Sequence, residues 1–278
     1  NEAQKYGTLE LAKIENMRTQ AEDLAAGKHV QSTDDLDAVE AELEGREAPA
    51  AGPVIAPPEK KYGVVAVCAG EGMASVFRDL GCDGVISGGQ TMNPATEDIL
   101  KQINATPAEI VFVFPNNKNI IMAAEQCVGL AEGKQVVVIP SKTVPQGISA
   151  LLLLDAEGEL EDNVQTMTEV MAAVSTAEVT YAARNSNFGG FDIKQGDYMA
   201  LLNGQLFDTH KNQDKLLKAL AREETFQNAE FINIYYGEDV KESDAEKTRK
   251  LFADACPQAE INLLSGGQPV YYYMISAE

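Results

Sequence analysis

The sequence lacks the residue patterns that mark several common protein classes. Its 278 residues include four cysteines and two histidines. The cysteines form no C-x-x-C pair and have no histidine close by in the sequence, so neither a disulfide framework nor a zinc site is indicated. No apolar run approaches the roughly 18 residues of a membrane span. We therefore expect a reducing, cytoplasmic setting and no membrane insertion.

Positive charge is also scarce. The sequence has 22 Lys and Arg against 43 Asp and Glu, which gives a net charge of -21. No run of residues forms a local basic patch that would offset this charge. Such a chain repels nucleic acid and anionic membrane surfaces, so we expect neither as a partner.

Catalytic motifs are missing as well. The sequence contains no G-x-x-x-x-G-K-[ST] phosphate loop and no carboxylate cluster suited to Mg²⁺ on a nucleotide. His29 falls in a predicted linker and His210 in a predicted polar loop, where neither suits a Ser/His/Asp or Cys/His arrangement. Cys68 and Cys127 fall on a predicted buried strand and helix, where thiols are usually inert. We expect no catalytic residue and no metal site in this chain.

Composition divides the chain into four parts. Residues 1–24 carry a helix end and a short strand-like segment, which cannot form a core alone and which the resemblance described below implies to be the tail of a preceding domain. Residues 25–61 combine seven acidic residues between Asp34 and Glu47 with a Pro/Ala/Gly run that follows them, which is typical of a linker; a short acidic helix within it stays open. Residues 62–176 predict a parallel α/β subdomain, and residues 177–278 predict an α+β subdomain with a mixed or antiparallel sheet.

The fold class rests on alternating strands and helices. In the first subdomain the predicted strands are 63–68, 84–87, 110–114 and 135–139, and the helices are 73–80, 94–103, 119–130 and 162–175. Unbroken β-branched runs, each followed by a helix, favour parallel strands with right-handed crossovers. In the second subdomain the predicted strands are 178–183, 198–202, 230–236, 260–264 and 270–275, and the helices are 212–221 and 243–255. Alternation along the last strand places Tyr271 and Tyr273 on one face and Tyr272 on the other.

Three loops rich in hydrogen-bond donors follow the predicted parallel strands. In an open α/β sheet, ligands bind beyond the carboxyl ends of the strands, so these loops form the candidate site. The candidate ligand-binding or partner-binding residues are Ser87, Gln90, Thr91 and Asn93 in the first loop, Asn116, Asn117, Lys118 and Asn119 in the second, and Ser141, Lys142 and Thr143 in the third. We expect the three loops to converge on one surface that recognises an anion or a partner.

The first of these loops leaves two interpretations open. Gly88 and Gly89 free backbone N–H groups near a helix N-terminus, which suits an anion. The alternative is ordinary capping, with Asn93 or Thr96 as the N-cap and Pro94 at the first helical position. The residues alone do not decide between the two.

A further loop contains Gly70 and Gly72, the first two glycines of a dinucleotide-binding fingerprint. Ser75 stands where the third glycine belongs, and no acidic residue ends the next strand. A nicotinamide cofactor, and with it an independent oxidoreductase, is therefore disfavoured. A glycine turn that serves strand–helix packing is the preferred interpretation.

Four longer segments carry a family resemblance. They are SGGQTMNPATEDIL (87–100), FPNNKNIIMAAEQ (114–126), VIPSKTVPQGISALL (138–152) and GGQPVYYYMISAE (266–278). Together they resemble the C-terminal region of the catalytic polypeptide of bacterial fatty acid kinase, which is a DAK2-domain-containing protein of the dihydroxyacetone-kinase-like group. The resemblance covers residues 62–278, and residues 2–20 are similar to the tail of that family's middle domain.

The resemblance implies a longer protein. An N-terminal kinase domain would bind ATP and Mg²⁺, a middle domain would carry metal-binding histidines before residue 1, and this chain would supply the C-terminal domain. No cofactor is expected in this chain itself. The expected partners are the kinase domain of the same protein and a separate fatty-acid-binding carrier of the DegV type. Whether the chain also forms a homodimer stays open.

That C-terminal domain is in turn similar to DegV-type fatty-acid-binding proteins, which implies a two-subdomain α/β fold. In those proteins, loops matching residues 90–94 and 116–119 carry hydroxyl groups that hold the acyl carboxylate. The second loop presents amides and Lys118 instead, whereas residues 141–147 keep the DegV-type pattern. The implied function is to dock the acyl-carrying partner, without catalysis, while the full-length protein phosphorylates the fatty acid to an acyl phosphate. The alternative is a DegV-like module that binds a lipid or small anion.

Overall fold

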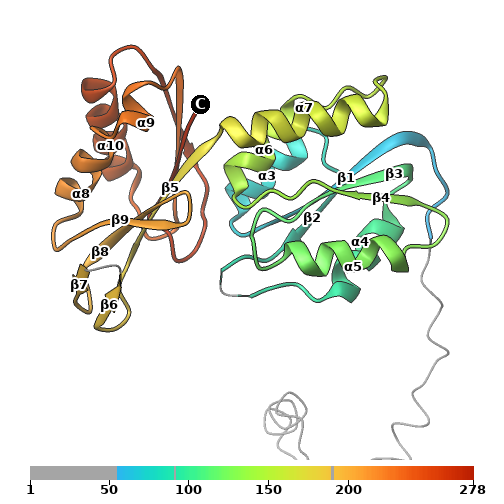
Figure 1. Ribbon diagram of the computed structural model, residues 1–278, viewed down its shortest axis with the longest axis horizontal. Coiled ribbons are helices and arrows are strands. Elements are labelled where there is room, and N and C mark those ends of the chain that lie inside the picture. The colour runs from blue at the N-terminus through green and yellow to red at the C-terminus, as the bar shows by residue number, and fades with distance from the viewer. Residues whose placement is uncertain (1–54, 91, 189–190) are drawn as a thin grey trace, which may run out of the picture. The chain divides into compact units, whose positions relative to one another are not determined.

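The computed structural model describes residues 55–90, 92–188 and 191–278 (Figure 1). They belong to one compact unit, Pro53–Glu278. The predicted tail at residues 1–24, and the predicted linker as far as residue 54, lie outside the described residues. The first strand begins at Lys60, so Lys60 and Lys61, which the composition assigns to the linker, belong to the first sheet.

Four parallel strands form the first sheet. They are β1 (Lys60–Cys68), β2 (Gly84–Ser87), β3 (Ala108–Phe114) and β4 (Gln135–Val138). Their order is β2-β1-β3-β4, and Ala66 of β1 is in register with Val85 of β2 and Phe114 of β3. The predicted parallel sheet is confirmed. The chain passes to opposite sides of β1 to reach β2 and then β3, so the topological switch point lies between β1 and β3.

Helices cover both faces of this sheet (Figure 1). Helices α3 (Glu71–Asp79), α6 (Val144–Leu152) and α7 (Leu160–Ala173) pack on one face, and α4 (Thr96–Ala105) and α5 (Ile121–Leu130) pack on the other. Burial on both faces explains why the end of β1 is an unbroken apolar run. Helix α6 is absent from the sequence prediction because Pro145 and Gly147 resemble loop residues. Proline is tolerated in a first helical turn, and Thr143 caps this helix.

The second half is built on a six-stranded sheet. Its strands are β5 (Ser175–Tyr181), β8 (Tyr198–Leu202), β9 (Gln205–His210), β10 (Phe231–Tyr236), β11 (Glu260–Ser265) and β12 (Tyr273–Ala277). The order is β11-β10-β12-β5-β8-β9. Strands β10 and β11 are parallel and the other neighbours are antiparallel, so the sheet is mixed. Strand β9 is not predicted from the sequence, and His210 therefore ends a strand instead of lying in a polar loop.

The two faces of this mixed sheet have different neighbours. Helices α8 (Gln213–Leu220), α9 (Glu224–Gln227) and α10 (Glu242–Ala255) cover one face and enclose a core of their own. The opposite face turns Tyr235 and Met274 into the core of the first half. A separate two-stranded hairpin joins β6 (Ser186–Phe188) and β7 (Phe191–Ile193). The two halves therefore share apolar packing.

The tyrosine run corrects one prediction. Strand β12 begins at Tyr273, and Val270 before it has a positive φ of 72°. This turn breaks the alternation that a continuous strand would impose. Tyr271 consequently packs in the core of the first half, whereas Tyr273 packs in the core beneath α8 and α10. The prediction that both rings share one face is wrong.

The glycine turn after β1 joins the two halves. A Cβ atom at Gly72 would overlap with the backbone carbonyl of Ser265, and one at Gly70 would overlap with that of Gly266. The N–H of Met73 donates to the carbonyl of Gly266 over 3.1 Å. The loop between β11 and β12 thus occupies the place at the N-terminus of α3 where a dinucleotide would put its phosphates. The packing interpretation of these glycines agrees with this geometry.

Candidate functional site

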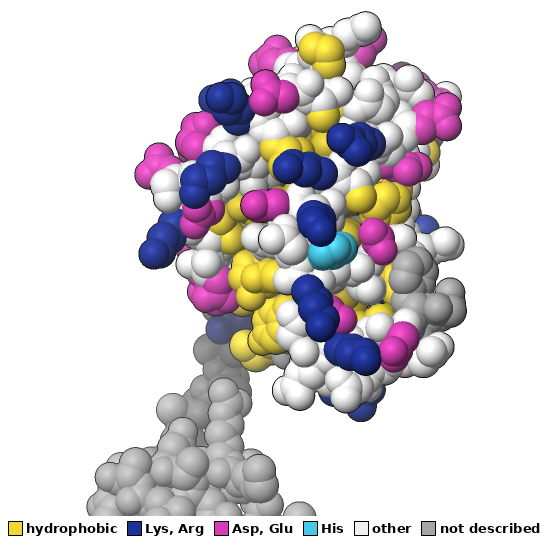
Figure 2. Space-filling model, turned by 90° about the vertical axis from the view of Figure 1, so that its left-hand side faces the viewer, with side chains coloured by type: hydrophobic (Ala, Val, Ile, Leu, Met, Phe, Trp, Pro, Cys, Tyr) yellow, Lys and Arg dark blue, Asp and Glu magenta, His cyan; other side chains and the backbone are white. Residues whose placement is uncertain are grey.

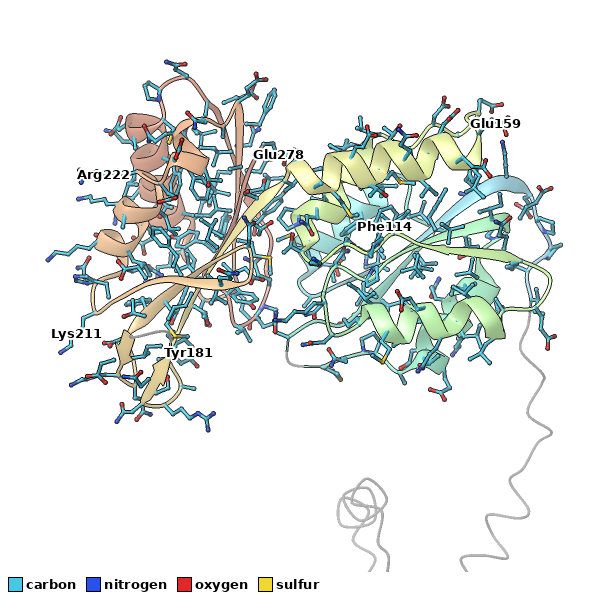
Figure 3. The ribbon with its side chains drawn as sticks, in the orientation of Figure 1. Phe114, Glu159, Tyr181, Lys211, Arg222 and Glu278 are labelled. Carbon is cyan, nitrogen blue, oxygen red and sulfur yellow. The ribbon has the colours of Figure 1, made fainter. Side chains whose placement is uncertain are left out.

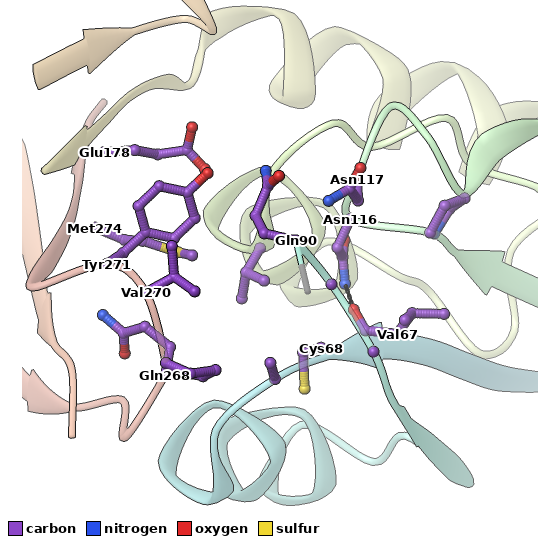
Figure 4. A pocket seen from close by; sticks show the side chains of 16 residues that line it. Val67, Cys68, Gln90, Asn116, Asn117, Glu178, Gln268, Val270, Tyr271 and Met274 are labelled. Atoms are coloured by element: carbon purple, nitrogen blue, oxygen red, sulfur yellow. Dashed lines mark hydrogen bonds between the residues drawn. The ribbon is translucent and has the colours of Figure 1, made fainter. Parts of the chain in front are cut away.

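A small pocket lies where the carboxyl ends of β1, β2 and β3 meet the second half (Figure 4). The first half contributes residues of the two loops that follow β2 and β3, including Gln90, Asn116 and Asn117. The second half contributes Glu178 and Tyr271. The cavity measures about 30 Å³, which holds one or two water molecules. An acyl chain does not fit this cavity as it stands.

Asn116 forms the floor of the pocket. Its backbone is in the left-handed region, with φ of 53°, and its side chain is 6% exposed. The amide nitrogen Nδ2 donates to the carbonyl of Val67 at 2.9 Å, and the amide oxygen Oδ1 accepts from Ser141 Oγ at 2.7 Å. The backbone N–H of Asn116 donates to the same Ser141 hydroxyl at 3.1 Å. These two candidate residues therefore satisfy one another across the ends of β3 and β4.

The rest of the loop after β3 divides into buried and exposed side chains. Asn117 is 5% exposed, and its Oδ1 accepts from the backbone N–H of Asn119 at 2.9 Å, which closes a local turn. Lys118 and Asn119 are exposed. Burial raises the pKa of the nearby Glu178, and the positive charge of Lys118 partly opposes this rise.

The loop after β2 contributes less to the pocket than the sequence predicts. Gln90 lines it, whereas the exposed side chains of Ser87 and Asn93 are not part of its lining. Thr91 lies outside the described residues. The N-cap of α4 is Ala95, whose N–H donates to Asp98 Oδ2 at 3.2 Å, so neither Asn93 nor Thr96 is the cap.

The loop after β4 is a capped helix start. Thr143 Oγ1 accepts from the N–H of Gln146 at 3.4 Å and lies 2.9 Å from the hydroxyl oxygen of Thr176. The N–H of Lys142 donates to Gln146 Oε1 at 2.9 Å. Lys142 is exposed, and none of these residues lines the pocket. Among the candidate residues of the third loop, Ser141 is connected to the site, because it forms hydrogen bonds with the pocket residue Asn116.

Glu178 and Tyr271 form the far wall of the pocket and are absent from the sequence prediction (Figure 4). Burial raises the pKa of Glu178 to about 7, and a hydrogen bond from the Tyr271 hydroxyl and the charge of Lys118 oppose this shift. Burial, followed by the charge of Glu178, raises the pKa of Tyr271. The available signal was a lone carboxylate within an otherwise uncharged strand. The sequence did not indicate what this carboxylate contacts, because Tyr271 and Lys118 lie far from it in the chain.

Gln268 contributes a third side chain from the second half. It is 1% exposed, and its Nε2 donates to the carbonyl of Tyr235 at 3.0 Å. Its Oε1 has no hydrogen-bond partner among the described residues and lies against Gly266, where a Cβ atom would overlap with it. This side chain fixes the loop between β11 and β12 against the sheet.

The cysteines are buried and free. Burial raises the pKa of Cys68 to about 12 and that of Cys127 to about 11, so both thiols are protonated at neutral pH and poor nucleophiles. In the part of the chain that the structure describes, no three His, Cys, Asp or Glu side chains are grouped so that they could hold a metal ion. Among the described helices, none has the length and apolar character that crossing a membrane requires.

Solved structures with this architecture define a class of protein. The DegV family protein Cg2579 of Corynebacterium glutamicum matches 78% of this chain and 96% of its own, at a TM-score of 0.58 and 15% identity. The fatty acid kinase (Fak) B3 protein of Streptococcus pneumoniae, solved with linoleic acid, matches 78% and 99% at a TM-score of 0.53 and 13% identity. The dihydroxyacetone kinase of C. freundii, solved with AMP-PNP and Mg²⁺, matches 78% of this chain and 48% of its own, at a TM-score of 0.53 and 12% identity. The fold is DegV-like.

Sequence comparison gives the family. The model of the FakA-like C-terminal domain of fatty acid kinase matches residues 63–278. The chain therefore belongs to the FakA-like C-terminal family. Protein YloV of Bacillus subtilis (strain 168) is 39% identical over the whole chain, and a protein of Staphylococcus epidermidis (strain ATCC 12228 / FDA PCI 1200) is 34% identical. The chain spans about half the length of these relatives, 47% in both cases.

Proposed function

We propose that this chain is the non-catalytic C-terminal domain of an ATP-dependent fatty acid kinase, and that it docks a fatty-acid-carrying protein of the DegV type. The full-length protein would then transfer phosphate from ATP to the fatty acid carboxylate, with ATP and Mg²⁺ held by its kinase domain. Support for the kinase context comes from the family and from the shared fold with a dihydroxyacetone kinase solved with AMP-PNP and Mg²⁺.

One observation carries the docking proposal: the strand-end edge presents exposed hydrogen-bond donors around a cavity that is too small for an acyl chain. Its inner donors, Asn116 and Ser141, bond to each other and to the backbone. Its outer donors remain exposed. These are Ser87, Gln90, Asn93, Lys118, Asn119 and Lys142. Exposed donors with two lysines suit an acidic or carbonyl-rich protein surface, whereas a cavity of about 30 Å³ does not suit an acyl chain.

Lys118 is the residue to test. Titration calorimetry would compare the chain with its Lys118→Ala variant against the DegV-type carrier of the same organism. We expect the variant to bind about tenfold more weakly, the effect of one lost charge-assisted contact. Lys101→Ala, which removes an exposed lysine from α4, is the matched control and should bind as the parent does.

A parallel titration separates the alternative function. If the domain binds a lipid or a small anion itself, free fatty acid will bind to it in the absence of the carrier, and Lys118→Ala will weaken that binding. If the carrier binds the parent and both lysine variants with equal affinity, the proposal that this edge of the sheet docks the carrier is wrong.

A further inference from the structure

A groove runs between α8 and α10 on the face of the second half that Figure 2 shows. The two helices cover the same side of the mixed sheet, and the space between them is about 570 Å³. Lys and Arg side chains lie across this face together with Asp and Glu, and apolar atoms are visible between them (Figure 2). The groove is separate from the strand-end pocket, with which it shares no lining residue.

The groove concentrates positive charge on an acidic chain. Its walls carry the exposed Lys218 and Arg222 on the α8 side, and Lys247 and Lys250 on the α10 side. Two carboxylates, Asp214 and Asp254, also line it. Cations thus outnumber acids two to one in the groove, whereas acids outnumber cations by 43 to 22 in the chain. The sequence shows no basic patch because the cations come from separate elements that only the fold brings together.

Three of the four cations are available to a partner. Lys247 Nζ pairs with Asp244 at 2.7 Å. Lys218, Arg222 and Lys250 form no ion pair with any residue that the structure describes. Figure 3 shows Arg222 projecting outward from the helical layer.

The floor of the groove is apolar and fixed. Leu251 and Ala255 are half-buried along it. The hydroxyl of Thr248, which is 4% exposed, donates to the hydroxyl oxygen of Tyr273 at 3.0 Å and so links α10 to β12. A rigid trough between two helices, with an apolar floor and charged walls, has the form that accepts a third helix.

The lining distinguishes this groove from a phosphate site. Arg222 follows the end of α8, and Lys250, Leu251 and Ala255 belong to the second half of α10. Many phosphate sites use the backbone N–H groups of helix N-termini or glycine-rich nests. This lining has no glycine, and its residue from the first turn of α8, Asp214, is itself an acid.

We propose that the groove between α8 and α10 is a docking site for an acidic amphipathic helix of a partner protein. Glutamates three and four positions apart on such a helix lie on one face and reach the cations of both walls. A narrow apolar stripe between them covers Leu251 on the floor. Electrostatic attraction speeds the encounter and fixes the orientation. This inference does not depend on which protein docks at the strand-end edge.

Fluorescence anisotropy with a labelled synthetic helix tests the proposal. The probe is a peptide of about 18 residues with glutamates on one face and a leucine stripe, titrated with the full 278-residue chain. The groove variant combines Lys218→Gln, Arg222→Gln and Lys250→Gln, since glutamine keeps helix propensity. The control combines Lys101→Gln, Arg184→Gln and Lys194→Gln, which removes the same charge elsewhere. Circular dichroism checks that both variants fold, and Lys250→Gln alone serves if the triple variant does not.

The expected result is a loss of about tenfold or more in peptide affinity for the groove variant, and a change within about twofold for the control. Binding of the peptide to the parent chain should also weaken as the salt concentration rises, because salt screens the charges. Equal affinity of the groove variant and the parent would overturn the proposal. So would equal binding of a peptide with the same composition in scrambled order. Binding of inorganic phosphate or of a DNA oligonucleotide at the groove, without binding of the peptide, would also overturn it.

Discussion

Asn116 and Ser141 hold each other across the ends of two neighbouring parallel strands. The Ser141 hydroxyl donates to the Asn116 side-chain oxygen at 2.7 Å and accepts from the Asn116 N–H at 3.1 Å. The same asparagine side chain donates to the carbonyl of Val67 at the end of β1. One buried amide thus links β1, β3 and the segment after β4. It holds in place the loops that carry the exposed donors.

Gly147→Ala should destabilise the fold. A Cβ atom at this position would overlap with the Asn116 side-chain oxygen, so the amide must move away from Ser141 and Val67. Buried polar groups would lose their partners, and we expect a loss of about 2–4 kcal/mol in the free energy of unfolding. Urea denaturation measures it.

Gly129→Ala is the matched control for Gly147→Ala. Gly129 also lies in a helix, α5, and a Cβ atom there would have no neighbour within 4 Å. Alanine should therefore stabilise the chain by about 0.5–1 kcal/mol through helix propensity. The double variant Gly147→Ala with Asn116→Ala should lose less than the sum of the two single changes. Strict additivity would show that the glycine acts independently of Asn116.

Glu178 should make stability fall as pH rises. Its pKa is raised from 4.5 in the unfolded chain to about 7 in the fold. The folded chain therefore binds the proton more tightly, and this contribution is fully present below pH 4.5 and lost as pH passes through about 7. The shift corresponds to about 3 kcal/mol. Glu178→Gln keeps an acceptor for Tyr271 without the charge, so the variant should be more stable than the parent at about pH 8.

Denaturant titrations at about pH 5 and about pH 8 measure this difference. Glu109→Gln is the control, because Glu109 also lies in a strand, β3, but is exposed. It should leave the pH dependence unchanged. Parallel pH profiles of the parent and Glu178→Gln would show that the buried carboxyl does not ionise in this range.

Gly72→Ala should disturb the junction of the two halves. The added methyl group would overlap with the backbone carbonyl of Ser265, which cannot rotate away as a side chain can. We expect a loss of about 2–4 kcal/mol, similar to other core overpacking. Ser75→Ala on the exposed side of the same helix should change stability by less than about 0.5 kcal/mol. Thermal melting of both variants compares them, and equal melting temperatures would contradict the close contact.

The chain should show no kinase activity of its own. The chain has no phosphate-binding sequence motif. In addition, the loop between β11 and β12 packs against the N-terminus of α3, where a nucleotide phosphate would otherwise bind. Incubation with ATP, Mg²⁺, fatty acid and the DegV-type carrier should give no acyl phosphate above a buffer blank. The full-length protein under the same conditions is the positive control. Acyl phosphate formed by the chain alone would place catalytic groups within it.

The sequence predicts the first sheet well because its strands are local apolar runs buried on both faces. It predicts less where the decisive contact is between distant segments. Helix α6 is missed since Pro145 and Gly147 resemble loop residues, although proline fits a first turn and Gly147 makes room for Asn116. The three loops are expected at the strand ends by the rule for parallel sheets. Glu178 and Tyr271 form the opposite wall of the pocket because the two halves pack together there. The hydrophobic pattern of the sequence does not predict that packing.

The position of β12 sets the order in which the second sheet can assemble. This strand lies between β10 and β5, and it joins segments far apart in the chain: Thr180 bonds to the carbonyl of Val270, 90 residues away. The meander of β5, β8 and β9 and the β10–α10–β11 unit can each form from nearby residues. Each keeps an unpaired edge until Tyr273–Ala277 inserts between them. We therefore expect closing the sheet to be a late, slow folding step, during which both edges stay open to pairing with another chain.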